Sequence, residues 1–269
     1  MENVDNCFPF LKVPTRSPKP RTTGLTLFMD WSLSTSEVEG LMEHSAEILD
    51  YAKLVDHAAT ALRHSRSFLK KKFEIYHKHQ VKVFMGGVIY QVAALQDQVR
   101  PFMETLKDVG FDAVEVSEDV MPGPYPLERR IADIKLGVEL GLEVMTEVGK
   151  KDPEAPIDPD YAISYALRDF ESGAKMVTVE NSDTILLMKT DPTPIFKFVE
   201  AIGLDRIRFE VGPTASGWPN VAAWVIKNFG PEVNLENVHP HWIGVLDGMR
   251  RGMARPVQYE FTAKRGAKL

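Results

Sequence analysis

Acidic and basic side chains follow one another closely at residues 143–152. Glu147, Lys150 and Lys151 surround the end of a short apolar run that closes at Gly149. Burying opposite charges side by side costs free energy unless neighbours compensate them, so such a cluster is typical of a site that uses its charges. A strand end followed by solvated lysines would give the same letters. The place of this stretch in the fold therefore decides between the two interpretations.

The chain from residue 24 onward repeats one unit, a short β-rich run followed by a longer stretch of helical periodicity. The runs cover residues 24–30, 51–56, 81–87, 113–118, 143–149, 176–180, 207–212 and 233–238. Apolar residues at three- and four-residue spacing cover residues 36–49, 60–79, 99–109, 127–140, 161–172, 194–202, 221–229 and 242–253. Eight alternating units predict a single-domain (β/α)8 TIM barrel, because closing the parallel sheet leaves no unpaired edge.

An open doubly wound sheet is the alternative to the barrel. That fold would more naturally carry a glycine-rich phosphate turn after its first strand, and the residues from Asp30 to Leu33 do not resemble one. The barrel prediction assigns residues 24–255 to the barrel, residues 1–23 to an extended N-terminal arm with four prolines, and residues 256–269 to a C-terminal tail.

Strand residues alternate between the barrel interior and the outer side that the helices cover. Four glutamates share the inward parity on the fourth to seventh strands: Glu115, Glu147, Glu180 and Glu210. Asp30, at the end of the first strand, could join them. Carboxylates gathered in a poorly solvated space need positive compensation, which Lys53, Lys151 or a divalent cation with oxygen ligands could supply. For any one glutamate, an ion pair that merely fills the barrel is the alternative.

Two histidines, His239 and His241, flank a proline after the eighth run. Imidazole can bind a metal, carry a proton or form structural hydrogen bonds, and the sequence leaves all three roles open. The chain has a single cysteine, Cys7, which excludes an internal disulfide and a clustered cysteine site for zinc.

The composition is that of an ordinary globular protein, with 44% hydrophobic and 26% charged residues in 269. A net charge of -6 argues against a broad nucleic-acid-binding surface. No apolar run approaches the roughly 18 residues of a membrane span. We therefore expect a cytoplasmic protein with no nucleic-acid or membrane partner. We also expect a homo-oligomer that acts on a small carboxylic acid, although composition and charge do not imply either.

Several segments resemble the phosphosulfolactate synthase family, in register over about residues 17–255. They are residues 19–26, 86–87, 106–117, 146–151, 209–210, 233–235 and 249–252. The resemblance implies a (β/α)8 barrel that adds sulfite to phosphoenolpyruvate with Mg²⁺, a lyase reaction that forms a carbon–sulfur bond. Related barrel proteins of the same fold include a plant protein linked to heat stress.

The second lysine of the family's Glu-Val-Gly-Lys-Lys motif, its proposed general acid, falls on Lys151. Addition of sulfite builds negative charge on the substrate, which a lysine ammonium can protonate and a metal can stabilise. We predict that Glu147 sets the pKa of this lysine. The predicted substrate contacts are Lys53, Lys150, Ser117, Asn181 and His57. The predicted Mg²⁺ ligands are drawn from Glu115, Glu180, Glu210 and Asp30.

The loops depart from the family pattern at positions where family members carry glycines or basic residues. Trp31, Asp56, His57 and Asn181 occupy these positions here. Such glycines and basic residues hold phosphate and sulfonate groups, so their loss indicates a less anionic or differently shaped substrate. Two alternatives follow: a diverged barrel lyase or isomerase acting on another small carboxylic acid, and a non-catalytic, stress-associated relative.

Overall fold

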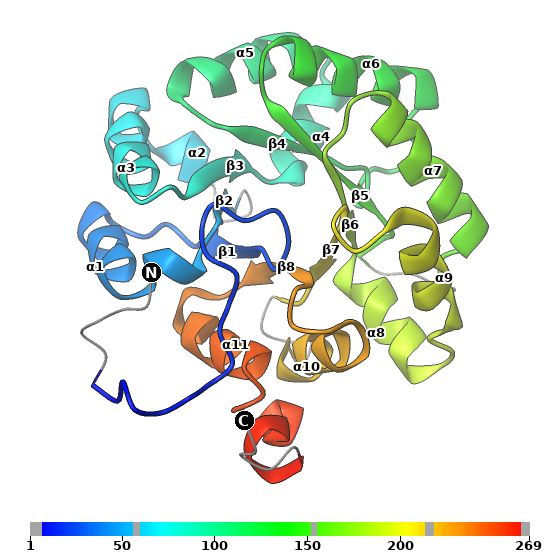
Figure 1. Ribbon diagram of the computed structural model, residues 1–269. Helices are drawn as coiled ribbons and strands as arrows, with labels where there is room; N and C mark the ends of the chain where they lie inside the picture. The colour runs from blue at the N-terminus through cyan, green and yellow to red at the C-terminus, as the bar shows by residue number, and fades with distance from the viewer. Residues whose placement is uncertain (1–6, 56–59, 152–154, 213–217, 265–269) are drawn as a thin grey trace.

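The computed structural model contains one closed barrel of eight parallel strands, in which each strand pairs with its neighbour in sequence and β1 pairs with β8 (Figure 1). It describes residues 7–55, 60–151, 155–212 and 218–264. The strands are β1 (Thr26–Asp30), β2 (Tyr51–Leu54), β3 (Lys82–Met85), β4 (Ala113–Val116), β5 (Glu143–Val148), β6 (Met176–Val179), β7 (Ile207–Glu210) and β8 (Asn234–Val238). The predicted TIM barrel is confirmed.

Helices surround the barrel on its outer side (Figure 1). They are α1 (Thr35–Ser45), α2 (Thr60–Arg63), α3 (Arg66–Lys78), α4 (Gly87–Leu95), α5 (Val99–Val109), α6 (Leu127–Glu139), α7 (Pro159–Glu171), α8 (Asn181–Lys189), α9 (Thr193–Ile202), α10 (Trp218–Phe229) and α11 (Ile243–Arg250). Shorter turns are η1 (Ala46–Ile48), η4 (Pro240–Trp242), η5 (Arg255–Val257) and η6 (Glu260–Lys264). Within the described ranges, no helix is long and apolar enough to cross a membrane.

Two helices occupy segments for which the sequence predicted no helix. α4 and α8 begin directly after β3 and β6, with no intervening turn. Gly86 takes the N-cap position of α4, and the Glu180 side chain caps α8 by accepting a hydrogen bond from Ser182 N. The predicted helix over residues 60–79 is divided instead into α2 and α3, because Ser65 caps α3 by accepting from Phe68 N at 3.2 Å.

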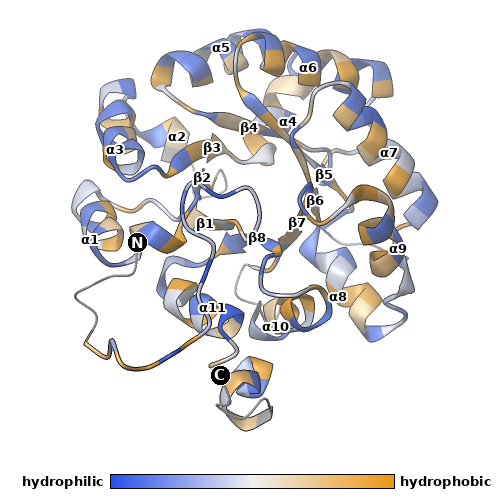
Figure 2. Cartoon of the chain, viewed as in Figure 1, coloured by the Kyte–Doolittle hydropathy of each residue, from blue (hydrophilic) through white to orange (hydrophobic). Residues whose placement is uncertain are grey.

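Apolar packing lies on both sides of the strands. Between strands and helices, residues such as Val83, Val114 and Val177 are fully buried. Hydrophobic and hydrophilic turns alternate along the helices that cover them (Figure 2). The barrel interior nearer the amino-terminal ends of the strands, here called the lower end, is filled by apolar side chains. They are Leu25, Leu27, Tyr51, Phe84, Ala113, Met145 and Met176. This apolar floor excludes water from the barrel and leaves the polar inward positions near the carboxyl ends of the strands.

Asp30 faces α3 on the outer side of the barrel, so its predicted place among the inward carboxylates is wrong. Its Oδ2 lies 2.5 Å from Lys72 Nζ and accepts a hydrogen bond from the Tyr76 hydroxyl at 2.8 Å. Leu27 fills the interior from the same strand. The side of β1 that faces inward is thus the opposite of the predicted one, because α3 supplies a buried cation that compensates Asp30.

Replacing Lys72 tests this pair, since both side chains are fully buried. Removing one partner of a buried ion pair leaves an uncompensated charge, so Lys72→Met is expected to lower the free energy of unfolding by about 3 kcal/mol. Chemical denaturation measures the loss. Lys71→Met, at the exposed neighbouring position, is the matched control and should change stability by less than about 0.5 kcal/mol. Equal losses in both variants would contradict the assignment.

Candidate active site

Two carboxylates and two basic side chains form a lower charged layer in the barrel. Lys53 Nζ lies 3.1 Å from Glu115 and 2.7 Å from Glu236. Arg208 reaches the same two glutamates, at 2.6 Å from Glu236 and 3.6 Å from Glu115. Burial opposes ionisation of Glu236, yet Arg208 and Lys53 lower its pKa to about 2. Burial raises the pKa of Glu115 to about 7, against the opposing effect of Lys53. The layer is therefore balanced in its groups, with two carboxyls and two basic side chains.

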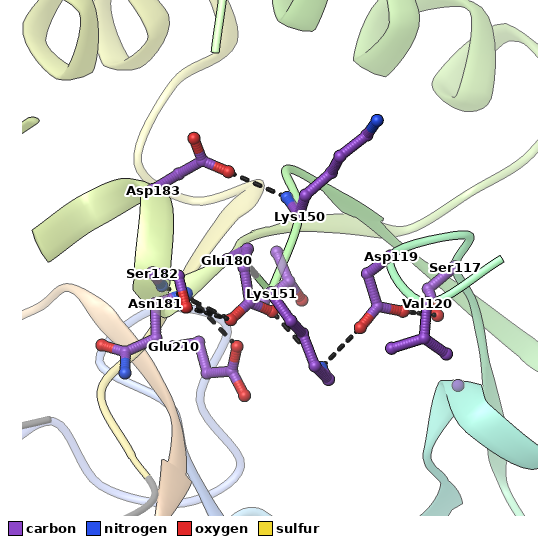
Figure 3. Close-up of polar contacts among 12 residues, drawn as sticks. Ser117, Asp119, Val120, Lys150, Lys151, Glu180, Asn181, Ser182, Asp183 and Glu210 are labelled. Carbon is purple, nitrogen blue, oxygen red and sulfur yellow. Dashed lines mark hydrogen bonds and ion pairs between the residues drawn. The ribbon is translucent and has the colours of Figure 1, made fainter. Parts of the chain in front are cut away.

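An upper layer at the carboxyl ends of the strands holds Glu147, Glu180, Glu210 and Asp119 around Lys151. The Lys151 ammonium lies 2.5 Å from Asp119 Oδ2 and 3.5 Å from Glu180 Oε2 (Figure 3). Glu210 accepts a hydrogen bond from the backbone N–H of Asn181 at 3.3 Å, which places it beside the start of α8. Because this layer has four carboxylates and one lysine, it carries excess negative charge.

The excess charge shifts the protonation of the groups that bear it. Burial first, and then the charges of Glu115 and Glu180, raise the pKa of Glu147 well above its usual range. Burial and Glu180 likewise raise the pKa of Glu210. Burial would lower the pKa of Lys151, but the surrounding carboxylates outweigh it and raise that pKa. Lys151 therefore carries its proton at neutral pH, while Glu147 and Glu210 resist ionisation.

Asp119 is held in position by α4. Its Oδ1 accepts hydrogen bonds from the Gln91 side-chain amide at 2.5 Å and from the Ser117 hydroxyl at 3.0 Å. The Gln91 carbonyl in turn accepts from Val120 N at 3.1 Å. Gly87 permits this approach, because a Cβ there would lie 2.0 Å from Ser117 Oγ. The contacts leave Asp119 Oδ2 directed at Lys151.

A cavity of about 450 Å³ opens beside the upper layer. Its described walls are Glu118, Glu147, Val148, Gly149, Lys150, Ala155, Ile157, Tyr161, Tyr165 and Asp183. Lys150 points away from Lys151 (Figure 3), so the ammonium groups of the two adjacent lysines lie in different surroundings. The rings of Tyr161 and Tyr165 stack at 5.3 Å, and the Tyr165 hydroxyl donates to Glu118 at 2.7 Å. The cavity has room for a small organic acid next to the carboxylates.

Comparison with known proteins gives this geometry a family. The family model of (2R)-phospho-3-sulfolactate synthase (ComA) matches residues 14–255. The chain belongs to the phosphosulfolactate synthase family. It is 30% identical over 257 residues to a phosphosulfolactate synthase of Methanothermobacter thermautotrophicus, covering 92% of this chain and 96% of that one. A phosphosulfolactate synthase of Bacillus subtilis is 24% identical, over 90% of this chain and 95% of its own length.

Solved structures outside the family share the barrel. The carboxyl transferase domain of pyruvate carboxylase from Rhizobium etli superposes with a TM-score of 0.57 at 14% identity, covering 90% of this chain and 46% of that chain. DHDPS from Cyanidioschyzon merolae superposes with a TM-score of 0.56 at 12% identity, covering 91% of this chain and 77% of that one. At these identities the likeness concerns the fold alone.

The family's Glu-Val-Gly-Lys-Lys motif lies where the upper layer forms. Of the residues predicted from the sequence, the structure brings Glu147, Lys151, Glu180 and Glu210 together at the mouth, with Asn181 next to them. Lys53 and Glu115 lie below, in the balanced layer. Ser117 contacts Asp119 and Gln91. His57 and Asp56 lie outside the described residues.

The two histidines after β8 contact each other instead of the carboxylates. His239 Nδ1 accepts a hydrogen bond from His241 N at 3.3 Å, and the two rings lie 5.2 Å apart. Burial first, and then His241, lower the pKa of His239. Neither histidine belongs to the described cluster of Asp119, Glu147 and Glu180 that could hold a metal.

Three charged residues of the site were not among the predicted site residues: Asp119, Arg208 and Glu236. Each could have been found by extending the alternation of its strand. Asp119 continues the inward side of Glu115 and Ser117, and Arg208 shares its side of β7 with Glu210. The alternation that predicts Glu115 and Glu210 inside the barrel therefore indicates these three residues as well.

The burial of the Glu147 carboxyl predicts that replacing it will stabilise the protein. Burial raises the pKa of Glu147, so at neutral pH folding must either protonate this carboxyl or bury it charged, and both cost free energy. Glu147→Gln removes that cost and keeps the side-chain shape, so the metal-free protein is expected to gain about 1 kcal/mol in free energy of unfolding. Urea denaturation in EDTA at pH 7 measures it. Glu139→Gln, on the exposed face of α6, is the control and should leave stability unchanged. A loss of stability in Glu147→Gln would show that its charge is compensated.

Proposed function

We propose that this protein is a carbon–sulfur lyase that adds sulfite to phosphoenolpyruvate, or to a closely related enoyl acid, with Lys151 as the general acid. The observation that carries the proposal is the position of the Lys151 ammonium, 2.5 Å from Asp119 and 3.5 Å from Glu180 at the carboxyl ends of the strands. Catalytic groups of (β/α)8 enzymes lie at this end. The names of the relatives support the reaction class.

The proposed step forms one carbon–sulfur bond and breaks one carbon–carbon π bond. The sulfur lone pair of sulfite attacks the methylene carbon, and the π electrons move to the adjacent carbon and its carboxylate. Lys151 then delivers a proton to that carbon. Its raised pKa keeps the ammonium charged before the step, so positive charge is already in place where negative charge develops.

The upper layer fits a hard divalent cation such as Mg²⁺. Asp119, Glu147 and Glu180 each offer one carboxylate oxygen, and these atoms lie within 4.8 Å of one another. Glu147 Oε1 is buried without a hydrogen-bond partner in the described part of the chain. An all-oxygen set suits Mg²⁺. When bound, the ion would polarise the substrate carboxylate. It would also weaken the attraction between the Lys151 ammonium and the carboxylates of Asp119 and Glu180, so that Lys151 releases its proton more readily.

A second candidate is the same kind of chemistry on a less anionic carboxylic acid. The described walls of the cavity carry three carboxylates, from Glu118, Glu147 and Asp183, and one lysine, Lys150. Lys53 and Arg208 are engaged by glutamates in the lower layer. A phosphate group would therefore meet few free cations from the described protein, which favours a substrate with less negative charge.

Turnover of sulfite with phosphoenolpyruvate in the presence of Mg²⁺ tests the first candidate. Proton and phosphorus NMR should show a phosphorylated sulfonate product. Lys151→Ala should lower kcat by about 100-fold or more, because it removes the proton donor. Lys189→Ala, at the exposed far end of α8, is the matched control and should retain the full rate.

The outcomes separate the two candidates. Product from phosphoenolpyruvate that depends on Lys151 supports the first. Turnover of enoyl acids that lack phosphate, with none of phosphoenolpyruvate, supports the second. Full activity of Lys151→Ala contradicts both, because each assigns the proton transfer to that ammonium.

A further inference from the structure

We propose that Asp183 is a positioning residue that fixes Lys151 by holding both ends of the connection between β5 and α7. This role rests on the proposed function of Lys151, although the contacts themselves do not. Asp183 lies in the first turn of α8 and is fully buried. Asp183 is not one of the carboxylates around Lys151 in the upper layer, so the reason for a buried carboxylate here lies in its own hydrogen bonds.

Each oxygen of Asp183 accepts a hydrogen bond from a different end of one loop. Oδ2 accepts from the backbone N–H of Lys150 at 2.8 Å, and Oδ1 accepts from the backbone N–H of Ile157 at 3.2 Å. Lys150 directly precedes Lys151 in the chain, and Figure 3 shows the bond from Asp183 to its backbone. One side chain thus anchors the loop on both sides of the catalytic lysine.

The end of β5 packs directly against the same turn of α8. Gly149 has φ +112°, and a Cβ there would lie 2.6 Å from Asp183 Oδ2 and 2.7 Å from Glu180 Cβ. Only glycine adopts this conformation readily and permits this approach. The backbone that leads into Lys150 and Lys151 therefore packs against α8 in addition to the hydrogen bond at Lys150.

Glu180 and Asp183 are three residues apart, so they lie on one face at the start of α8. Glu180 contacts the Lys151 ammonium at 3.5 Å, while Asp183 holds the backbone next to it. One helical turn therefore fixes both the main chain and the charged end of Lys151. Placing a reacting group within a fraction of an ångström has a large effect on rate, so loss of this anchor should slow the chemical step.

Asp183→Asn tests the role with little change of shape. A carboxylate accepts two N–H groups at once, whereas an amide offers one oxygen and turns its NH₂ toward the other N–H. Turnover with sulfite and phosphoenolpyruvate should show kcat lowered about 10- to 100-fold, with KM changed less than about threefold. Combined with Lys151→Ala, the substitution should add almost no further loss, because both act through the same ammonium.

Backbone hydrogen exchange gives a readout that does not depend on turnover. The amides of Lys150 and Ile157 should lose protection in Asp183→Asn by at least about tenfold at the end that is released. Asp191→Asn is the matched control, because Asp191 also accepts a backbone N–H, from Thr193 at 3.0 Å, but at an exposed position beyond α8. That control should leave the rate and the exchange of both amides unchanged.

The outcomes are separable from those of the proposed function. Unchanged exchange at both amides, or losses that add fully to those of Lys151→Ala, would overturn the positioning role. If the wild type does not turn over sulfite and phosphoenolpyruvate, the proposed reaction fails while the exchange result still decides the anchor. If Asp183→Asn does not fold, Asp183→Ser, whose short hydroxyl cannot reach both N–H groups, should reproduce the exchange and the rate loss.

Discussion

Excess buried carboxylate at the barrel mouth is the constraint on which the other features of the site depend. Four acidic side chains meet one lysine in the upper layer, whereas the lower layer has two of each sign. Buried charge without compensation destabilises a fold. The imbalance persists only at the carboxyl ends of the strands, where a substrate or a cation can supply what is missing. Below it, the paired layer and the apolar floor stabilise the barrel.

The loops and helices around the mouth hold the charged side chains of the upper layer in position. Gln91 on α4 orients Asp119, and α8 presents Glu180 to the Lys151 ammonium. These contacts join three strand ends that are far apart in the sequence. Contacts from α4 and α8 hold the arrangement, and the cavity lies beside it. These are the features that the proposed binding of a small acid requires. Membership of the phosphosulfolactate synthase family is consistent with the proton transfer that we propose for Lys151.

The sequence was sufficient to predict the barrel and most of the upper layer. Strand alternation predicts Glu147, Glu180 and Glu210 inside the barrel, because this signal is local and repeats with a fixed period. The resemblance to the family distinguishes Lys151 from Lys150. Asp30 could not be placed in this way, since its side of β1 depends on Lys72, which arrives from α3. The local pattern shows which residues lie on the same side of a strand. Contacts with other elements decide which of the two sides faces the barrel interior.

The same limit applies to the helices that start without a loop. α4 and α8 are short and lack a strong amphipathic pattern, so the glycines and polar residues at their starts resembled turns. Their positions matter most for function, because they bring Gln91 and Asp183 to the mouth. The structure was needed to identify these two residues, since nothing in their own segments indicates what they contact.

Cation binding by the metal-free protein tests the central claim most directly. Mn²⁺ titration followed by electron paramagnetic resonance should find one site per chain that Mg²⁺ displaces. Glu180→Gln and Asp119→Asn should each weaken it by about 10-fold or more, because each removes a charged ligand, while Glu139→Gln leaves it unchanged. Absence of a displaceable site, or equal affinity in all three variants, would contradict the claim that the carboxylates at the mouth are undercompensated and can bind a cation.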